Sequence, residues 1–317
     1  MLGWKYNLLA LLAVVAALVT GVVVGAGPLA AGANTRIQDQ KGTINAEREQ
    51  LRRQVRTLQG ELARGSALTT AASATVARGQ LPGRSVVILV LPGVTDAAVT
   101  RTARALTRAG ASVVQTLRLT STYFDPRNAK SPLEDLALRL VPPDVTFPDG
   151  ASPIDRVSTV LARATVTSKK DSSKAVDQPA AEVLAGLKEL GAVNPVSGDS
   201  GRRAELAVVL APATPIGSGP VQKVAAQTAV GLASALDKAG RGVVVVGPAR
   251  SATGAGVLAG LRAASTAGVS TVDVGDSAAG PLATVLAVRE QLRGGSGNYG
   301  DGPGATALLP TFVAPPT

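Results

Sequence analysis

The chain has 317 residues, of which 45% are hydrophobic, 17% charged and only 2% aromatic, and its formal net charge is +10. This balance excludes a chain that is disordered throughout, because there is enough apolar surface to form a core. Cysteine and histidine are absent and Met1 is the only methionine, which excludes disulfides and Ser–His–Asp or Cys–His catalysis. We therefore expect no enzyme and no bound cofactor. We also expect no nucleic-acid partner, since few aromatic side chains could stack on bases.

The first 33 residues contain a membrane-anchor candidate. The segment from Leu8 to Gly27 carries no charge and is long enough to cross a bilayer, since about 20 apolar residues cover roughly 30 Å. Gly21 and Gly25 form a G-x-x-x-G pair, a spacing that lets two membrane helices approach closely. A cleaved leader is the alternative, although its apolar core usually spans only about 7–15 residues. We predict an uncleaved single-pass anchor in the cell membrane or envelope, with the bulk of the chain outside.

Residues 34–65 show the apolar spacing of a coiled-coil stalk. The side chains that would form the seam are Ile37, Ile44, Leu51, Val55, Leu58 and Leu62. Lys41 and Arg48 occupy core positions in the first half, so only the second half predicts a well-packed seam. A single amphipathic helix folded back on the body is the alternative. We favour self-association, which would make the chain a homo-oligomer through its anchor and stalk.

The folded body is predicted to follow a linker. Residues 66–83 are rich in Ala, Thr, Ser and Gly, which indicates a fraying helix end and a linker. The body, residues 84–310, opens on S-V-V-I-L-V-L, a run typical of a strand buried on both faces. Thr95 can cap the helix that comes next. The first predicted elements are a strand at 85–91, a helix at 96–109 and a strand at 112–119.

The remainder of the body continues this alternation after a less regular middle part. Helices are expected at 131–140, 153–166, 179–190, 221–239, 256–264 and 280–292. Strands are expected at 206–210, 242–246 and 270–274. Short apolar runs that alternate with amphipathic helices predict an α/β fold with a mostly parallel sheet flanked by helices. We expect two similar halves, about 84–167 and 179–310, in one domain, and a tail at 311–317.

Two features near strand ends could suggest a ligand. Asp273 and Asp276 could form a carboxylate pair, but acidic residues at such places more often act as caps. Gly254-Ala255-Gly256 resembles a dinucleotide-binding fingerprint, but its third spacing is wrong and six residues separate it from its strand. Neither feature predicts an enzyme.

The most distinctive local sequence is a glycine-rich segment near the C-terminus. Its candidate residues are Asn298, Tyr299, Gly300, Gly302, Pro303 and Gly304. Closely spaced glycines let the backbone adopt positive φ values and approach a neighbour closely. One interpretation is a structural turn in which Tyr299 packs over the domain before a last strand at 305–309. The other is a binding loop or a contact with a partner subunit.

The layout of these parts resembles the actinobacterial MctB family of copper transporters. The resemblance rests on the N-terminal span that runs into a short coiled coil, the opening S-V-V-I-L-V strand and the closing N-Y-G-x-G-P-G-A motif. It covers nearly the full chain and implies copper efflux and copper homeostasis, with copper as a transported ion. The residues assign no metal ligand, because soft copper sites use Cys, Met or His. We expect a route formed by an oligomer, or an indirect effect.

A protein of another class could share this layout. An anchor, a coiled coil and an α/β body that is poor in metal ligands also suit a bitopic scaffold that organises a cell-envelope or cell-separation complex. Its partners would be envelope proteins, bound through the stalk and the glycine-rich loop.

Overall fold

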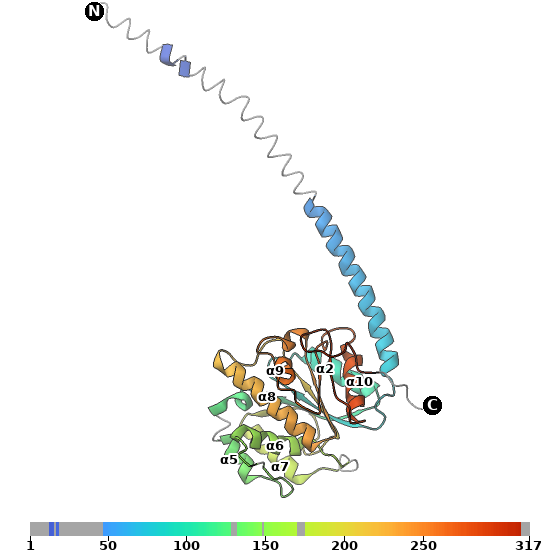
Figure 1. The fold of residues 1–317 in the computed structure, drawn as a ribbon, viewed down its shortest axis with the longest axis vertical. Helices are drawn as coiled ribbons and strands as arrows, with labels where there is room; N and C mark the ends of the chain where they lie inside the picture. The colour runs from blue at the N-terminus through green and yellow to red at the C-terminus, as the bar shows by residue number, and fades with distance from the viewer. Residues whose placement is uncertain are drawn as a thin grey trace, which may run out of the picture. The chain divides into compact units, whose positions relative to one another are not determined.

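The computed structural model describes residues 13–15, 17–18, 47–127, 132–147, 149–169 and 175–311 (Figure 1). The chain divides into two compact units between Gly65 and Ser66. Within the part of the chain that the structure describes, no helix combines the length and the apolar character needed to cross a membrane. Most of the predicted anchor, with Gly21 and Gly25, lies outside the described residues, as does the N-terminal part of the predicted stalk.

The second unit is built on one seven-stranded sheet with the order β3-β2-β1-β4-β5-β6-β7. The strands are β1 (Ser85–Val90), β2 (Ser112–Leu119), β3 (Val193–Gly198), β4 (Leu206–Leu210), β5 (Val243–Val246), β6 (Val269–Val272) and β7 (Asn298–Tyr299). All neighbours are parallel except β2 and β3, which are antiparallel. The predicted α/β fold with a mostly parallel sheet is confirmed.

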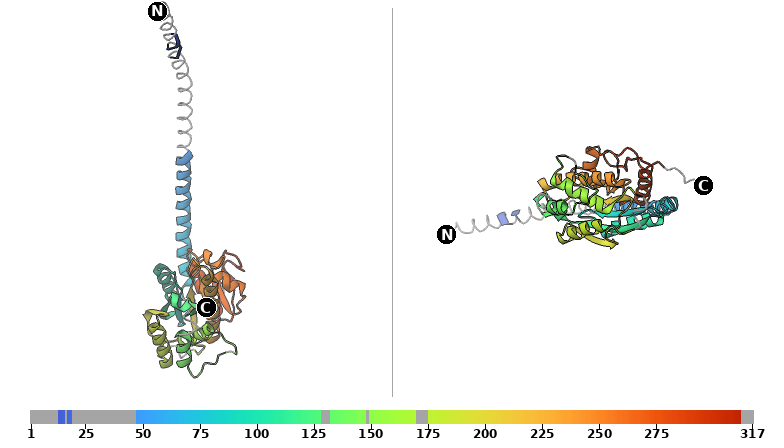
Figure 2. Two further views of the ribbon diagram at one scale, coloured as in Figure 1. Left: turned by 90° about the vertical axis from the view of Figure 1, so that its left-hand side faces the viewer. Right: turned by 90° about the horizontal axis from the view of Figure 1, so that it is seen from below.

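Helices cover both faces of this sheet (Figure 2). They are α2 (Asp96–Arg108), α3 (Ser121–Phe124), α5 (Pro132–Arg139), α6 (Pro153–Thr165), α7 (Gln178–Glu189), α8 (Pro220–Ala239), the 3-10 helix η2 (Ala249–Ala252), α9 (Val257–Ala263) and α10 (Gly280–Gln291). Alternate strand residues point to opposite faces. Val87 and Leu89 therefore join the core beneath α5 to α9, whereas Val86 and Ile88 join the core beneath α2 and α10.

Residues 66–77, within the predicted linker segment, are helical. Ala77 and Leu81 are buried in the core beneath α2 and α10. The backbone N–H of Leu81 donates to the carbonyl of Ala109, at 2.8 Å. The end of this segment is therefore packed against the body.

The helix ends follow the signals in the sequence. The Thr95 side chain caps α2 by accepting the N–H of Ala98. Ser152 and Asp155 form a reciprocal capping box at the start of α6. Such caps satisfy N–H groups that have no partner within the helix.

The structure differs from the predicted elements at the two edges of the sheet. β3 was missed because it is an edge strand that contains Asn194 and Pro195 and is exposed beyond its first residue, so it carries no apolar pattern. The strand expected at 305–309 is reduced to an isolated bridge between Tyr299 and Ala307.

The strand order reverses between β1 and β4, where a doubly wound fold usually binds its ligand. Here Gly93 and Pro212 are in close contact, since a Cβ on Gly93 would lie 3.2 Å from the Pro212 Cβ. Gly256 likewise has a structural reason, because a Cβ there would lie 2.2 Å from the carbonyl oxygen of Ser251. Gly256 therefore serves a tight approach to η2, whereas nothing lies within 4 Å of a Cβ on Gly254.

Candidate functional site

The C-terminal glycine-rich loop encloses a buried ion pair. Arg262 lies in the last turn of α9, and Asp273 directly follows β6. The Arg262 Nη1 atom lies 2.8 Å from Asp273 Oδ2, and the two side chains are 5% and 0% exposed. Removing charges from water is costly unless they are paired and hydrogen-bonded. The remaining hydrogen bonds of the two groups therefore determine whether this buried pair stabilises the loop.

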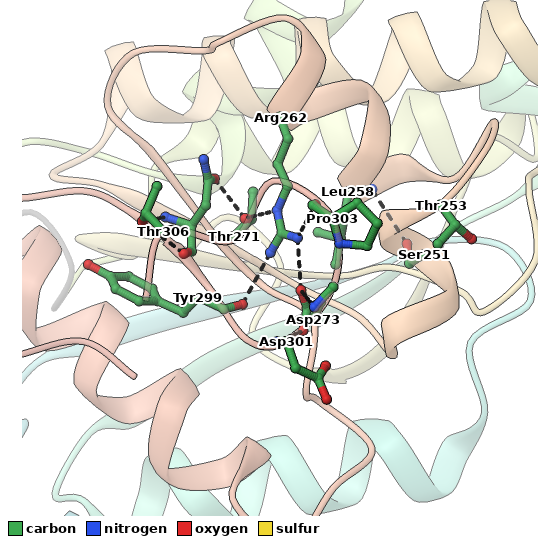
Figure 3. Close-up of polar contacts among 12 residues, drawn as sticks. Ser251, Thr253, Leu258, Arg262, Thr271, Asp273, Tyr299, Asp301, Pro303 and Thr306 are labelled. Atoms are coloured by element: carbon green, nitrogen blue, oxygen red, sulfur yellow. Dashed lines mark hydrogen bonds and ion pairs between the residues drawn. The ribbon is translucent and has the colours of Figure 1, made fainter. Parts of the chain in front are cut away.

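Arg262 uses its remaining donors to join the loop to the sheet (Figure 3). Its Nε donates to Thr271 Oγ1 at 2.9 Å, its Nη1 to the carbonyl of Pro303 at 2.8 Å, and its Nη2 to the carbonyl of Tyr299 at 3.1 Å. With Asp273, the guanidinium therefore has four acceptors on three segments of the chain. Such charge-assisted bonds are stronger than bonds between neutral groups.

Asp273 in turn fixes the backbone of the loop. Its Oδ1 accepts the N–H of Asp301 and its Oδ2 accepts the N–H of Gly302, each at 3.0 Å. Asp276, the other member of the possible carboxylate pair, is exposed. Asp273 thus acts as a cap for the loop, in agreement with the interpretation that acidic residues at a strand end are caps.

The glycines allow the loop to approach this carboxylate. Gly300 has a φ of +127°, and a Cβ at this position would lie 1.7 Å from Asp273 Oδ1. A Cβ on Gly302 would lie 2.8 Å from Oδ2 of the same side chain, and one on Gly304 would lie 3.2 Å from Arg262 Cδ. Any larger residue at position 300 would displace the carboxylate.

Asn298 and Tyr299 hold the start of the loop. The Asn298 side-chain oxygen accepts the Thr271 hydroxyl at 2.8 Å. Tyr299 is buried in the core beneath α2 and α10, and its hydroxyl donates to Glu290. Burial, together with the hydrogen bond and negative charge of Glu290, raises the pKa of Tyr299. These contacts fit a structural turn, and a partner contact by the same loop stays a prediction.

A cavity of about 320 Å³ lies beside the loop. Arg262, Thr271, Asn298 and Thr306 contribute to its wall, so it presents hydroxyl, amide and guanidinium groups. Among the residues that the structure describes, no group of three or more His, Cys, Asp or Glu side chains is placed to hold a metal ion. The loop and its cavity therefore offer hydrogen-bond donors and acceptors.

The predicted stalk residues fall into two sets. Ile37 and Ile44 lie outside the described residues. Residues 47–65 are helical, and the four remaining seam residues are each 50% or more exposed, namely Leu51, Val55, Leu58 and Leu62. The structure therefore leaves an apolar stripe on this helix without a partner in the described part of the first unit.

Arg262 was missed by reasoning from the sequence. It lies in V-L-A-G-L-R-A, where an arginine at the end of a short helix is usually taken as solvated. The available signal was the combination of one charged residue in an apolar helix with an aspartate at the end of the next buried strand. Burial of both charges requires that they pair.

Comparison with known proteins places the chain in a family. The family model described as "Copper transport outer membrane protein, MctB" matches residues 1–310. The chain belongs to the MctB family.

Individual members of the MctB family are related to this chain over almost their whole length. The protein named copper transporter MctB of Mycobacterium tuberculosis (strain ATCC 25618 / H37Rv) is 26% identical over 322 residues, covering 97% of this chain and 99% of the relative. The protein of the same name from Mycobacterium leprae (strain TN) is 27% identical over the same coverage. The family is named for transport and for an outer-membrane location, not for an enzymatic activity.

Proposed function

We propose that this chain takes part in copper efflux across the cell envelope as a non-enzymatic, membrane-anchored protein. The match of the MctB family model to residues 1–310 carries this proposal. The uncharged segment from Leu8 to Gly27 supports an anchor, because its length and apolar character suit a single membrane span. The α/β body would then lie outside the membrane that holds the anchor.

The side chains of this protein argue against a soft copper site within one copy. The sequence has no Cys or His and only Met1, whereas thiolate, thioether and imidazole groups are the usual copper ligands. We therefore place the copper route at an interface between copies, or assign the protein an indirect effect on a route formed by others. Both versions depend on assembly more than on a metal centre.

The stalk supplies the surface for this assembly. Leu51, Val55, Leu58 and Leu62 occupy the core positions of two heptads and are exposed. In a parallel pair of helices, position g of one copy faces position e of the next heptad in the other. Glu47 and Arg52 occupy these positions, so the two copies would form Glu47–Arg52 pairs of opposite charge on both sides of the seam.

A copper measurement in cells tests the proposal. A strain without the gene is grown in excess copper, and cell-associated copper is measured with the full chain, with a double variant (L51D and L58D) or with a control variant (R53D) restored. Asp at the two seam positions places like charges in the interface, whereas Arg53 lies on the opposite side of the helix in this heptad register.

The expected result is that the gene lowers cell copper, that R53D also lowers it, and that the double variant does not. Unchanged copper in the deletion strain would overturn copper efflux. An accompanying defect in the envelope or in cell separation would favour the scaffold, for which the exposed stalk stripe is the supporting observation. If the double variant lowered cell-associated copper as much as the unaltered chain, only the assembly through the stalk would be overturned.

A further inference from the structure

A cavity of about 670 Å³ lies on the side of the sheet opposite α2 and α10. Asp155, Thr159 and Arg163 of α6 line it, and Gly231 and Lys238 of α8 line it as well. The three α6 residues are four apart, so they share one face of the helix. The volume is within the usual range for small-molecule sites.

Helices α6 and α8 run in the same direction along this cavity. A Cβ on Gly231 would lie 3.1 Å from Asp155 Oδ1, and a Cβ on Gly240 would lie 3.3 Å from the Val166 Cβ. The beginning of α6 therefore lies beside the middle of α8, and the end of α6 lies beside the end of α8. Asp155 belongs to one end of the cavity, and Arg163 with Lys238 belongs to the other. The eight residues from Asp155 to Arg163 rise by about 12 Å.

The basic end holds two guanidinium groups with too few counter-charges. Arg163 Nη1 and Arg203 Nη2 each lie 2.9 Å from a different oxygen of Asp177. Arg163 also binds Asp144, whose side chain is 58% exposed. Lys169 and Lys238 line the cavity as well, so among the described residues of this end four cations face the carboxylates of Asp144 and Asp177.

Arg203 is the less compensated of the two guanidinium groups, since it is paired only with Asp177, whereas Arg163 is paired with Asp177 and Asp144. Its side chain is 12% exposed, and its Nε is buried without a hydrogen-bond partner. Burial and the charge of Arg163 lower the pKa of Arg203, while Asp177 and Asp144 oppose this shift. A negatively charged group in the cavity would therefore be stabilised at this end.

The acidic end has the opposite character. Asp155 lines the cavity there. Asp155 Oδ2 accepts the N–H and the hydroxyl of Ser152, while its Oδ1 faces Gly231, whose missing side chain leaves room. No Lys or Arg among the described lining residues belongs to this end of the α6 and α8 walls.

We propose that this cavity binds a short zwitterionic peptide. Its C-terminal carboxylate would contact Arg203 and Lys238, and its N-terminal ammonium would contact Asp155. Extended chains span about 3.3–3.6 Å per residue, so about three or four residues bridge the 12 Å between the two ends. This site is independent of the copper proposal, because it involves other residues and a ligand of another class.

The proposal is tested by titration calorimetry on the full chain in detergent micelles, with trialanine as the probe. N-acetyl-trialanine lacks the ammonium and trialanine amide lacks the carboxylate, and each is expected to bind about tenfold or more weakly than trialanine. Lys238→Ala should weaken trialanine by a similar factor. Lys223→Ala, on the same helix but away from this cavity, should leave its binding unchanged.

Asp155→Asn tests the acidic end of the cavity independently of the basic end. It should weaken trialanine about tenfold and leave N-acetyl-trialanine unaffected. If this variant loses the fold through its helix cap, as shown by circular dichroism, the comparison of trialanine with N-acetyl-trialanine on the unaltered chain tests the ammonium contact. Absence of trialanine binding at roughly 10 mM, which corresponds to less than about 3 kcal/mol, overturns the proposal. Equal binding of the three probes also overturns it, as does equal loss in the Lys238 and Lys223 variants.

Discussion

Two of the places where this protein buries arginine side chains treat the charge differently. At the C-terminal loop, Arg262 has four acceptors, including the fully buried carboxylate of Asp273. At the cavity between α6 and α8, Arg203 shares Asp177 with Arg163 and keeps an unpartnered Nε. A fully satisfied ion pair holds a fold in one conformation, whereas an under-neutralised cation facing a cavity is suited to an outside ligand.

The largest expected effect comes from replacing each of these arginines by glutamine. Arg262→Gln leaves Asp273 without its cation in the core and should lower the free energy of unfolding by about 3–5 kcal/mol. Arg203→Gln removes a charge that repels Arg163, and Asp177 keeps Arg163 as a partner, so the change should cost only about as much as one hydrogen bond, about 1 kcal/mol. Urea unfolding of the body measures both. Similar losses in the two variants would contradict the distinction.

Gly300→Ala should give the next largest effect. The new Cβ would meet Asp273 Oδ1, and the φ of +127° is unfavourable for alanine, so we expect a loss of about 2–4 kcal/mol. Gly294→Ala is the matched control, because Gly294 has a φ of +80° but nothing lies within 4 Å of its Cβ position. It should cost only the backbone strain, about 1 kcal/mol. Equal costs would show that the carboxylate moves away without resistance.

Alkaline pH should weaken the body through two tyrosines. Burial raises the pKa of Tyr123, whose hydroxyl is 2.8 Å from Ser158 Oγ, and burial with Glu290 raises that of Tyr299. Because both folded pKa values lie above the unfolded value of 10.0, their stability contribution is complete below pH 10 and is lost as pH rises further. Each tyrosine should contribute a slope of up to about 1.4 kcal/mol per pH unit.

Tyr299→Phe separates the contribution of the loop from that of the core. Urea unfolding between pH 9 and about 11 should show a smaller slope in this variant and in Tyr123→Phe. An unchanged slope in Tyr299→Phe would mean that the loop opens before the tyrosine titrates, which would contradict the tight attachment of the loop to the sheet.

The comparison also explains what could be predicted from the sequence. The buried strands were evident because β1, β4 and β5 are unbroken apolar runs in a parallel sheet that is covered on both faces. The edge strand β3 and the two-residue β7 carry no such pattern. The glycine-rich motif was visible as a motif, but the arginine that it surrounds was not, because only the fold brings Arg262 next to Asp273.

The cavity between α6 and α8 could not be predicted at all. Its walls come from α6 with the loops on either side of it, from α8, and from Arg203 in the segment before β4, which are separated in the chain. Each charged residue alone resembles one on a solvated surface. Only the direction of the two helices separates the acidic end near Asp155 from the basic end near Arg163.

The smallest expected effect on the free energy of unfolding is at Asp144. Removing this charge should strengthen ligand binding, whereas removing a charge at the loop should weaken the fold. Asp144 is 58% exposed, so Asp144→Asn should change the free energy of unfolding by less than about 1 kcal/mol. The same change leaves Arg163 and Arg203 with only Asp177, so trialanine should bind about two- to threefold more tightly. Calorimetry and urea unfolding on the one variant test both statements. Weaker binding would mean that Asp144 contacts the ammonium, which would reverse the orientation of the peptide in the cavity.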